Sequence, residues 1–249
     1  FEGNRHSGQS LVSYGGVFLQ GDAVISSCTF IENEGEDAGA IYARGVQFVP
    51  EPAIRNCVFV GNSSTSRAGA IFTENGTTSI ENCTFIDNHA ATDGGAIVTS
   101  RGYDVISNSL FINNSAGGDG GAAFVVGTRP FGSQSLTNHT FVNCTFYGNT
   151  AEGNGAAITA SGSEVRVVNS IFWNNCPEPF ALGENIATFF VYNAIVEGGF
   201  EPLGNVSTIP PEAEGIIDAP PQFVDAAGGD FMLSATSPAI DVGLDHVPL

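Results

Sequence analysis

Short stretches in which apolar and polar residues alternate run along most of the chain, separated by clusters rich in Gly, Asn and Asp. Residues 83–86 and 96–99 are typical of these stretches. Alternation over four to six residues predicts β-strands, and the Gly, Asn and Asp clusters between them predict turns. Apolar residues do not recur at helical spacing. The pattern therefore predicts an all-β protein built from short strands.

These segments form an internal repeat. Its first motif is Phe-x-x-Asn, and successive copies start 26 to 35 residues apart. The Phe residues of this motif are Phe30, Phe59, Phe85, Phe111, Phe146 and Phe172. Its second motif is Gly-Ala-Ile or a near variant, six or seven residues after the Asn, as at Gly39, Gly69 and Gly95. A Cys or Ser stands two positions before each Phe.

The length of the repeat predicts the fold. A step of about 26 residues is shorter than the helical repeats, which run to 33 residues or more. A coil of about three strands and three turns uses this many residues, and coils stacked about 4.8 Å apart bury a continuous column of side chains. We predict a right-handed parallel β-helix, since parallel crossover connections are almost always right-handed. Coils are expected over residues 1–197, and an irregular, proline-rich segment at 198–249 is expected to cover the open end.

The repeat also predicts what fills the interior. The Phe side chains should point inward and stack from coil to coil, and each Asn should bond the Asn or the turn backbone of the next coil. Cys28, Cys57, Cys83 and Cys144 share one repeat position, which favours a column of free, buried thiols. A disulfide between neighbouring coils or a metal site are the alternatives for these cysteines.

The paired motifs resemble the repeats of the polymorphic outer membrane protein family, which are β-helical cell-surface proteins of the autotransporter kind. Residues 221–225 and 237–243, the latter reading Ser-Pro-Ala-Ile-Asp-Val-Gly, resemble the closing segment of large secreted bacterial β-helix proteins. The resemblance implies a protein that is secreted or attached to the cell surface. It implies adhesion or display more often than catalysis.

Composition narrows the range of partners. The chain has 249 residues with 26 acidic side chains and 7 basic ones, all Arg, which gives a net charge of −19. Such a surface repels phosphate backbones and anionic lipids, so nucleic acid and anionic membranes are excluded as partners. No stretch approaches the roughly 20 apolar residues of a membrane-spanning helix. The same charge disfavours polyanionic polysaccharides as substrates.

One acidic column is a candidate metal site. Asp37, Arg67, Asp93 and Asp119 all stand two residues before a repeat Gly, so they should stack in adjacent coils. Asp93 and Asp119 would then be like charges about 5 Å apart, and Ca²⁺ is the cation suited to such oxygen ligands. Ordinary turn chemistry, in which Asp bonds the local backbone, is the interpretation that the sequence favours. No other cofactor is expected.

Two further sets of candidate residues follow from the sequence. Trp173, Tyr147 and Phe141 are placed as sugar-contacting aromatics beside the long insertion at residues 127–138. Seven Asn-x-Ser/Thr sequences are candidate glycosylation acceptors: Asn62, Asn75, Asn82, Asn113, Asn138, Asn143 and Asn205. Asn-rich repeats produce such sequences by chance.

These observations predict an extracellular β-helix with a structural or adhesive role. Its lateral faces would bind a glycan, a surface protein or further copies of the chain. The alternative is a carbohydrate-active enzyme, either a polysaccharide lyase or a glycoside hydrolase with paired carboxylates. No carboxylate pair stands out in the sequence, and the four His residues share no repeat position. The sequence therefore names no catalytic residue.

Overall fold

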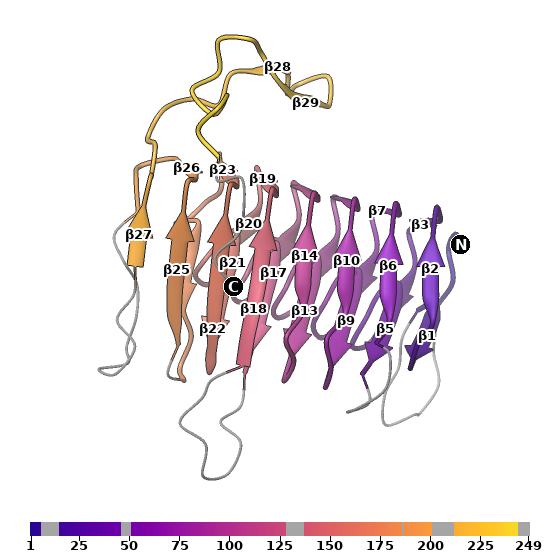
Figure 1. Cartoon of the computed structure of the whole chain (residues 1–249). Helices are drawn as coiled ribbons and strands as arrows, with labels where there is room; N and C mark the ends of the chain where they lie inside the picture. Colours follow the sequence, from indigo (N-terminus) through magenta and orange to yellow (C-terminus); the bar gives the residue numbers. More distant parts are fainter. Residues whose placement is uncertain (6–14, 46–50, 128–136, 186, 201–211, 244–249) are drawn as a thin grey trace.

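The chain is a parallel β-solenoid, which confirms the predicted fold class (Figure 1). The structure is a computed structural model, and it describes residues 1–5, 15–45, 51–127, 137–185, 187–200 and 212–243. Each full coil holds four strands rather than the three expected, because a strand of only two residues follows the third corner. The strands of successive coils pair in parallel and build four sheets, here called sheets I to IV in chain order.

Sheets I and II have seven and eight strands. Sheet I consists of β1 (Val17–Gln20), β5 (Ile41–Arg44), β9 (Ile71–Glu74), β13 (Ile97–Ser100), β17 (Ala123–Val126), β21 (Ile158–Ser161) and β24 (Phe180–Leu182). Sheet II consists of β2 (Val24–Ser26), β6 (Ala53–Arg55), β10 (Ser79–Glu81), β14 (Val105–Ser107), β18 (Thr137–Val142), β22 (Ser163–Val168), β25 (Thr188–Tyr192) and β27 (Glu212–Glu214).

The other two sheets hold shorter strands. Sheet III consists of β3 (Thr29–Ile31), β7 (Val58–Val60), β11 (Thr84–Ile86), β15 (Leu110–Ile112), β19 (Thr145–Tyr147), β23 (Ile171–Trp173) and β26 (Ile195–Val196). Sheet IV consists of β4 (Glu34–Gly35), β8 (Ser63–Ser64), β12 (His89–Ala90), β16 (Ser115–Ala116) and β20 (Thr150–Ala151). Sheet IV therefore ends before the other three.

The predicted Phe column forms the centre of the core. Rings from neighbouring coils stack nearly parallel, with centroids 5.0 Å apart between Phe30 and Phe59 and 4.6 Å apart between Phe111 and Phe146. All six predicted Phe side chains are fully buried. Stacked aromatic pairs contribute about 0.5–1.5 kcal/mol each beyond the area they bury. The column therefore ties every coil to the next along the axis.

The predicted Asn ladder is also present, and it runs beside the Phe column. In each step the main-chain N–H and the side-chain Nδ2 of one Asn both donate to Oδ1 of the Asn in the next coil. For Asn62 and Asn88 these distances are both 3.0 Å. The second Nδ2–H donates to the main-chain oxygen of a Phe in the preceding coil, as from Asn88 to Phe59 at 3.1 Å. Each buried carboxamide is thereby satisfied without water.

The ladder includes one more coil than predicted, on the N-terminal side of Phe30. Phe1 stacks on Phe30 at 4.9 Å, and Nδ2 of Asn4 donates to Oδ1 of Asn33 at 2.8 Å. Phe1-Glu2-Gly3-Asn4 is therefore a seventh Phe-x-x-Asn copy. Its spacing of 29 residues from the next copy is the signal that could have found it.

Corners between sheets need a left-handed backbone. The corner between sheets II and III has positive φ at Asn56, Asn82, Asn108 and Asn143, with angles of 50° to 54°. Asn adopts this conformation more readily than most residues. At the return to sheet I the requirement is different, because a Cβ on Gly95 would collide with the carbonyl oxygen of Gly121 in the next coil. The repeat Gly is thus required by close backbone approach.

The C-terminal segment has two parts with different positions. β27 extends sheet II and Ile217 pairs with Ile195, so solenoid pairing continues past residue 197. The antiparallel hairpin of β28 (Phe223–Asp225) and β29 (Asp230–Leu233) lies beside the ends of β19 and β23 rather than over the open end of the coil stack (Figure 1). A hydrogen bond of 2.7 Å from Nδ2 of Asn193 to the Val242 carbonyl also ties this segment to the last coil.

The ladder can be tested with Asn88→Ala. The change removes four side-chain hydrogen bonds, two to Asn114 and Phe59 and two from Asn62. We expect the free energy of unfolding, measured by urea denaturation, to fall by about 4 kcal/mol, because buried partners are left unsatisfied. Asp87→Gly is the matched control, since Asp87 is exposed with φ of 53° and should cost less than about 1 kcal/mol. Equal effects of the two changes would contradict a structural role of the ladder.

Candidate functional site

The three aromatic residues proposed from the sequence do not form one site. Phe141 is fully buried and packs against Phe146 in the core, so its assignment as a sugar-contacting residue is wrong. Inward and outward side chains alternate along β18, and Phe141 lies between the outward-facing Thr140 and Val142. Trp173 on β23 is half-buried and pairs in register with Tyr147 on β19.

Tyr147 is already in contact with the C-terminal hairpin. Its ring meets Phe223 at 6.0 Å and Phe231 at 5.1 Å, both edge-on. The Tyr147 hydroxyl also accepts a hydrogen bond of 3.0 Å from Nδ2 of Asn174. These contacts make Tyr147 an anchor for the hairpin, which leaves Trp173 without its predicted partners.

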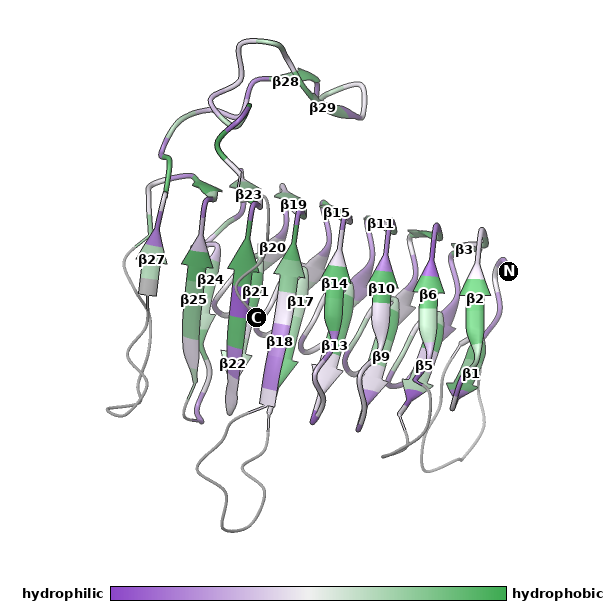
Figure 2. Ribbon diagram, in the orientation of Figure 1, coloured by the Kyte–Doolittle hydropathy of each residue, from purple (hydrophilic) through white to green (hydrophobic). Residues whose placement is uncertain are grey.

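The outer face of sheet II offers a different set of residues close to the same insertion. Tyr103, Asn138, Thr140 and Arg166 line a cleft of about 260 Å³. Register brings them together, because Thr140 pairs with Arg166 and Asn138 with Glu164. In Figure 2, hydrophilic residues occupy part of β18 and of β22, and β25 beside them is mostly hydrophobic. Tyr103 precedes β14 and is 53% exposed.

Arg166 is the centre of this surface. Its guanidinium carbon lies 5.5 Å from the centroid of the Phe190 ring, in cation–π geometry. Phe190 follows Arg166 in register in the next coil. Partial burial raises the pKa of Glu164 above its usual range, and the nearby Arg166 opposes this shift. The carboxylate and the guanidinium thus offset each other's charge in the cleft.

Asn138 carries a buried acceptor beneath this surface. Its Oδ1 is inaccessible to solvent and has no hydrogen-bond partner among the described residues. Such an acceptor is costly to leave without a donor. An aromatic ring, an arginine, a carboxylate and a carboxamide on one flat strand surface can stack on an apolar sugar face and bond its hydroxyls.

A buried polar pair supports this surface from inside the solenoid. Asp104 Oδ1 accepts from the Thr78 N–H and Oδ2 from the Thr73 hydroxyl, both at 2.7 Å. His139 Nδ1 lies 3.4 Å from Asp104 Oδ2, and both side chains are almost fully buried. Asp104 is next to Tyr103, and His139 stands between Asn138 and Thr140. The pair therefore holds the strand ends whose neighbouring residues line the cleft, a function that the sequence analysis did not assign to His139.

The acidic column is stacked as predicted, and its carboxylates bond backbone N–H groups. Asp93 Oδ1 accepts from the Asp119 N–H at 3.0 Å, and Asp119 Oδ1 accepts from the Asn154 N–H at 2.7 Å. Both carboxylates therefore form turn contacts between one coil and the next. Arg67 makes no ion pair with Asp37 or Asp93 within the described residues. No group of three His, Cys, Asp or Glu that could hold a metal occurs in the same residues, and Ca²⁺ binding stays a prediction.

The glycosylation candidates fall into distinct environments. Asn62 is fully buried in the ladder, so it cannot carry a glycan in the folded chain. Asn138 is half-buried in the cleft, and Asn75 is half-buried at a turn. Asn205 lies outside the described residues. The exposed candidates, all at left-handed corners, are Asn82, Asn113 and Asn143.

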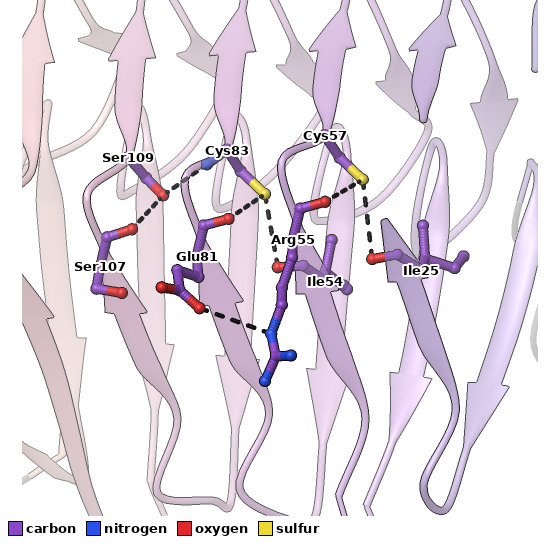
Figure 3. Close-up of polar contacts among 8 residues, drawn as sticks. All are labelled: Ile25, Ile54, Arg55, Cys57, Glu81, Cys83, Ser107 and Ser109. Carbon is purple, nitrogen blue, oxygen red and sulfur yellow. Dashed lines mark hydrogen bonds and ion pairs between the residues drawn. The ribbon is translucent and has the colours of Figure 1, made fainter. Parts of the chain in front are cut away.

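The cysteine column is a column of free thiols. Figure 3 shows Cys57 and Cys83 in adjacent coils, each donating to main-chain oxygens. Cys83 Sγ contacts the Glu81 and Ile54 carbonyls at 3.4 and 3.6 Å, and in the following coil Ser109 takes the same position. Burial raises the pKa of Cys83 and of Cys144 to about 12. These thiols are therefore structural, because all five cysteines are free and the described residues contain no group of three His, Cys, Asp or Glu that could hold a metal.

Alkylation tests this assignment. In native protein at pH 8, iodoacetamide should modify the exposed Cys176 first and the half-buried Cys28 more slowly. Cys57, Cys83 and Cys144 should stay unmodified, because they are buried and the thiolate is the reactive form. Intact-mass measurement should show modification of all five cysteines after denaturation without a reductant. Incomplete labelling under those conditions would reveal a disulfide.

Fold and site together define a repeat protein of the β-solenoid class with a polar cleft on one lateral sheet. The right-handed β-helix family model matches residues 1–195, and the chain belongs to this family. No curated protein matches the chain in sequence. Within the described residues, no helix has the length and hydrophobicity to cross a membrane.

Proposed function

We propose that this chain is an extracellular rod that binds a neutral glycan on the outer face of sheet II. The observation that carries the proposal is the cleft of Tyr103, Asn138, Thr140 and Arg166, backed by the ring of Phe190. A shallow surface of this kind suits a chain of sugars lying across several coils. The role is adhesive, because the repeat resembles those of polymorphic outer membrane proteins and the stacked coils make a stiff support.

The charge of the cleft favours an uncharged ligand. Arg166 is flanked in sequence and space by Glu164, so it does not present an isolated positive charge to a polyanion. The net charge of −19 adds a long-range repulsion of anionic polysaccharides. Neutral hexoses can stack on Tyr103 and bond Glu164 and Arg166 through their hydroxyls.

One observation supports the enzymatic alternative. A carboxyl group whose pKa is raised by burial is suited to act as a general acid, and Glu164 has this property at the edge of the cleft. Glycoside hydrolysis needs a second carboxylate across the sugar. The residues that line the cleft include no carboxylate, and Glu164 lies beside it in register with Asn138, which favours binding over hydrolysis.

The test is a screen of neutral and acidic oligosaccharides on an array, with affinities then measured by calorimetry. We expect neutral oligosaccharides to bind and polyuronates to fail. Arg166→Gln and Tyr103→Ala should each weaken binding about tenfold, since each removes a direct contact worth roughly one to two hydrogen bonds. Val24→Ser is the matched control, because Val24 is an exposed residue on the same sheet in a distant coil.

Two results would count against the proposal. Equal loss of binding in the Val24→Ser control would show that the sheet II cleft is not the site. Release of reducing ends or unsaturated products from any bound oligosaccharide, abolished by Glu164→Gln, would establish the enzyme instead.

A further inference from the structure

The Asn ladder ends at Asn175, and its end is chemically incomplete. In the preceding coil, Asn149 donates its N–H and its Nδ2–H to Oδ1 of Asn175 at 3.1 and 2.9 Å. The main-chain oxygen of Asn149 accepts from the Cys176 N–H at 3.0 Å. Every inner Asn of the ladder thus uses three polar groups to contact the coil that follows it.

For Asn175 the same three groups have no partner among the described residues. Its Nδ2 donates backward to the Phe146 carbonyl at 3.0 Å, and its Oδ1 is occupied by Asn149. The N–H, the second Nδ2–H and the main-chain carbonyl of Asn175 are therefore the groups without a partner among the described residues. The cause is the end of sheet IV at β20, because the next coil turns away at Gly198 and Gly199 instead of supplying another Asn.

A cleft of about 530 Å³ lies at the end of the ladder, where Gly199 takes the register position of a following Asn. Its lining includes Asn175, Pro177, Pro179, Glu178, Glu197 and Gly199. The volume lies in the range of small-molecule sites, about 300–1,000 Å³. The unpaired set of two donors and one acceptor therefore borders a space large enough for a sugar.

The side chains that line the cleft restrict the chemical class of ligand that it can bind. Pro177 and Pro179 have no N–H to pair with an added β-strand, so a peptide cannot extend sheet IV along this edge. Glu178 and Glu197 disfavour a carboxylate ligand and offer acceptors for hydroxyl groups. A neutral carboxamide attached to a polyhydroxylated ring meets both conditions.

We propose that this cleft binds the acetamido group of an N-acetylhexosamine. The acetamido oxygen accepts from the N–H and Nδ2–H of Asn175, as the next Asn does in every inner coil. The acetamido N–H donates to the Asn175 carbonyl. The methyl group lies against the proline rings, and ring hydroxyls donate to the glutamates. This site is separate from the sheet II cleft and does not depend on it.

The test uses nuclear magnetic resonance of the ¹⁵N-labelled full chain, titrated with N-acetylglucosamine, N-acetylgalactosamine and glucose. We expect both N-acetylated sugars to shift the main-chain and side-chain amide signals of Asn175, and glucose to leave them unchanged. Asn175→Asp keeps an oxygen for Asn149 and removes both Nδ2–H donors, so it should weaken binding at least about tenfold. Asn113→Asp introduces the same charge at an exposed corner and should bind normally.

Several outcomes would overturn the proposal. One is that N-acetylated sugars at tens of millimolar leave the amide signals of Asn175 unshifted. This result needs no variant, so it holds even if Asn175→Asp does not fold. Another is an equal response to glucose, which would remove the acetamido selectivity. Binding that disappears in Arg166→Gln while Asn175 signals stay unchanged would assign the sugar to the sheet II cleft alone.

Discussion

The ladder of buried Asn carboxamides is the interaction on which the rest of this solenoid depends. Each carboxamide bonds the coils on both sides, so neighbouring coils must keep a common spacing and register at this corner. A slip of one residue would turn the inward Phe and Cys side chains to the solvent. The stacked Phe rings and the thiol column can form because the ladder holds the coils in register beside them.

This constraint also decides where the chain can vary. Sheets III and IV flank the ladder, and the connection between them stays short in the coils that contain it. The corner between sheets I and II carries no ladder, and the stretch between its strands grows from residues 101–104 in one coil to 127–136 in the next. Tyr103 lies between β13 and β14 at this same corner, and Asn138 is the second residue of β18, close to the corner. The candidate glycan cleft thus lies where added residues do least harm to the register.

The sequence was sufficient for the features that recur in every coil. Phe59, Phe85 and their equivalents repeat the same chemistry, so a single motif predicts their stacking and burial. The cleft could not be predicted in this way, because Arg166 and Phe190 meet only through the register of β22 and β25. Phe141 shows the limit most clearly. A shift of one position along β18 separates an inward ring from the outward Thr140, and aromatic character alone does not decide which of the two faces solvent.

A ladder built from one kind of hydrogen bond has a direction, and its two ends therefore differ. In each Asn–Asn contact, the Asn of the more N-terminal coil donates and the Asn of the more C-terminal coil accepts. At the last rung, Asn175 has donors without an acceptor among the described residues. In the inner coils, the next Asn bonds the N–H and Nδ2–H of each ladder Asn. At the last rung the same groups keep the orientation that the fold gives them, but they have no partner from a following coil within the part of the chain that the structure describes. The Asn175 end faces a cleft with proline and carboxylate walls, and these walls suit it to a small neutral ligand.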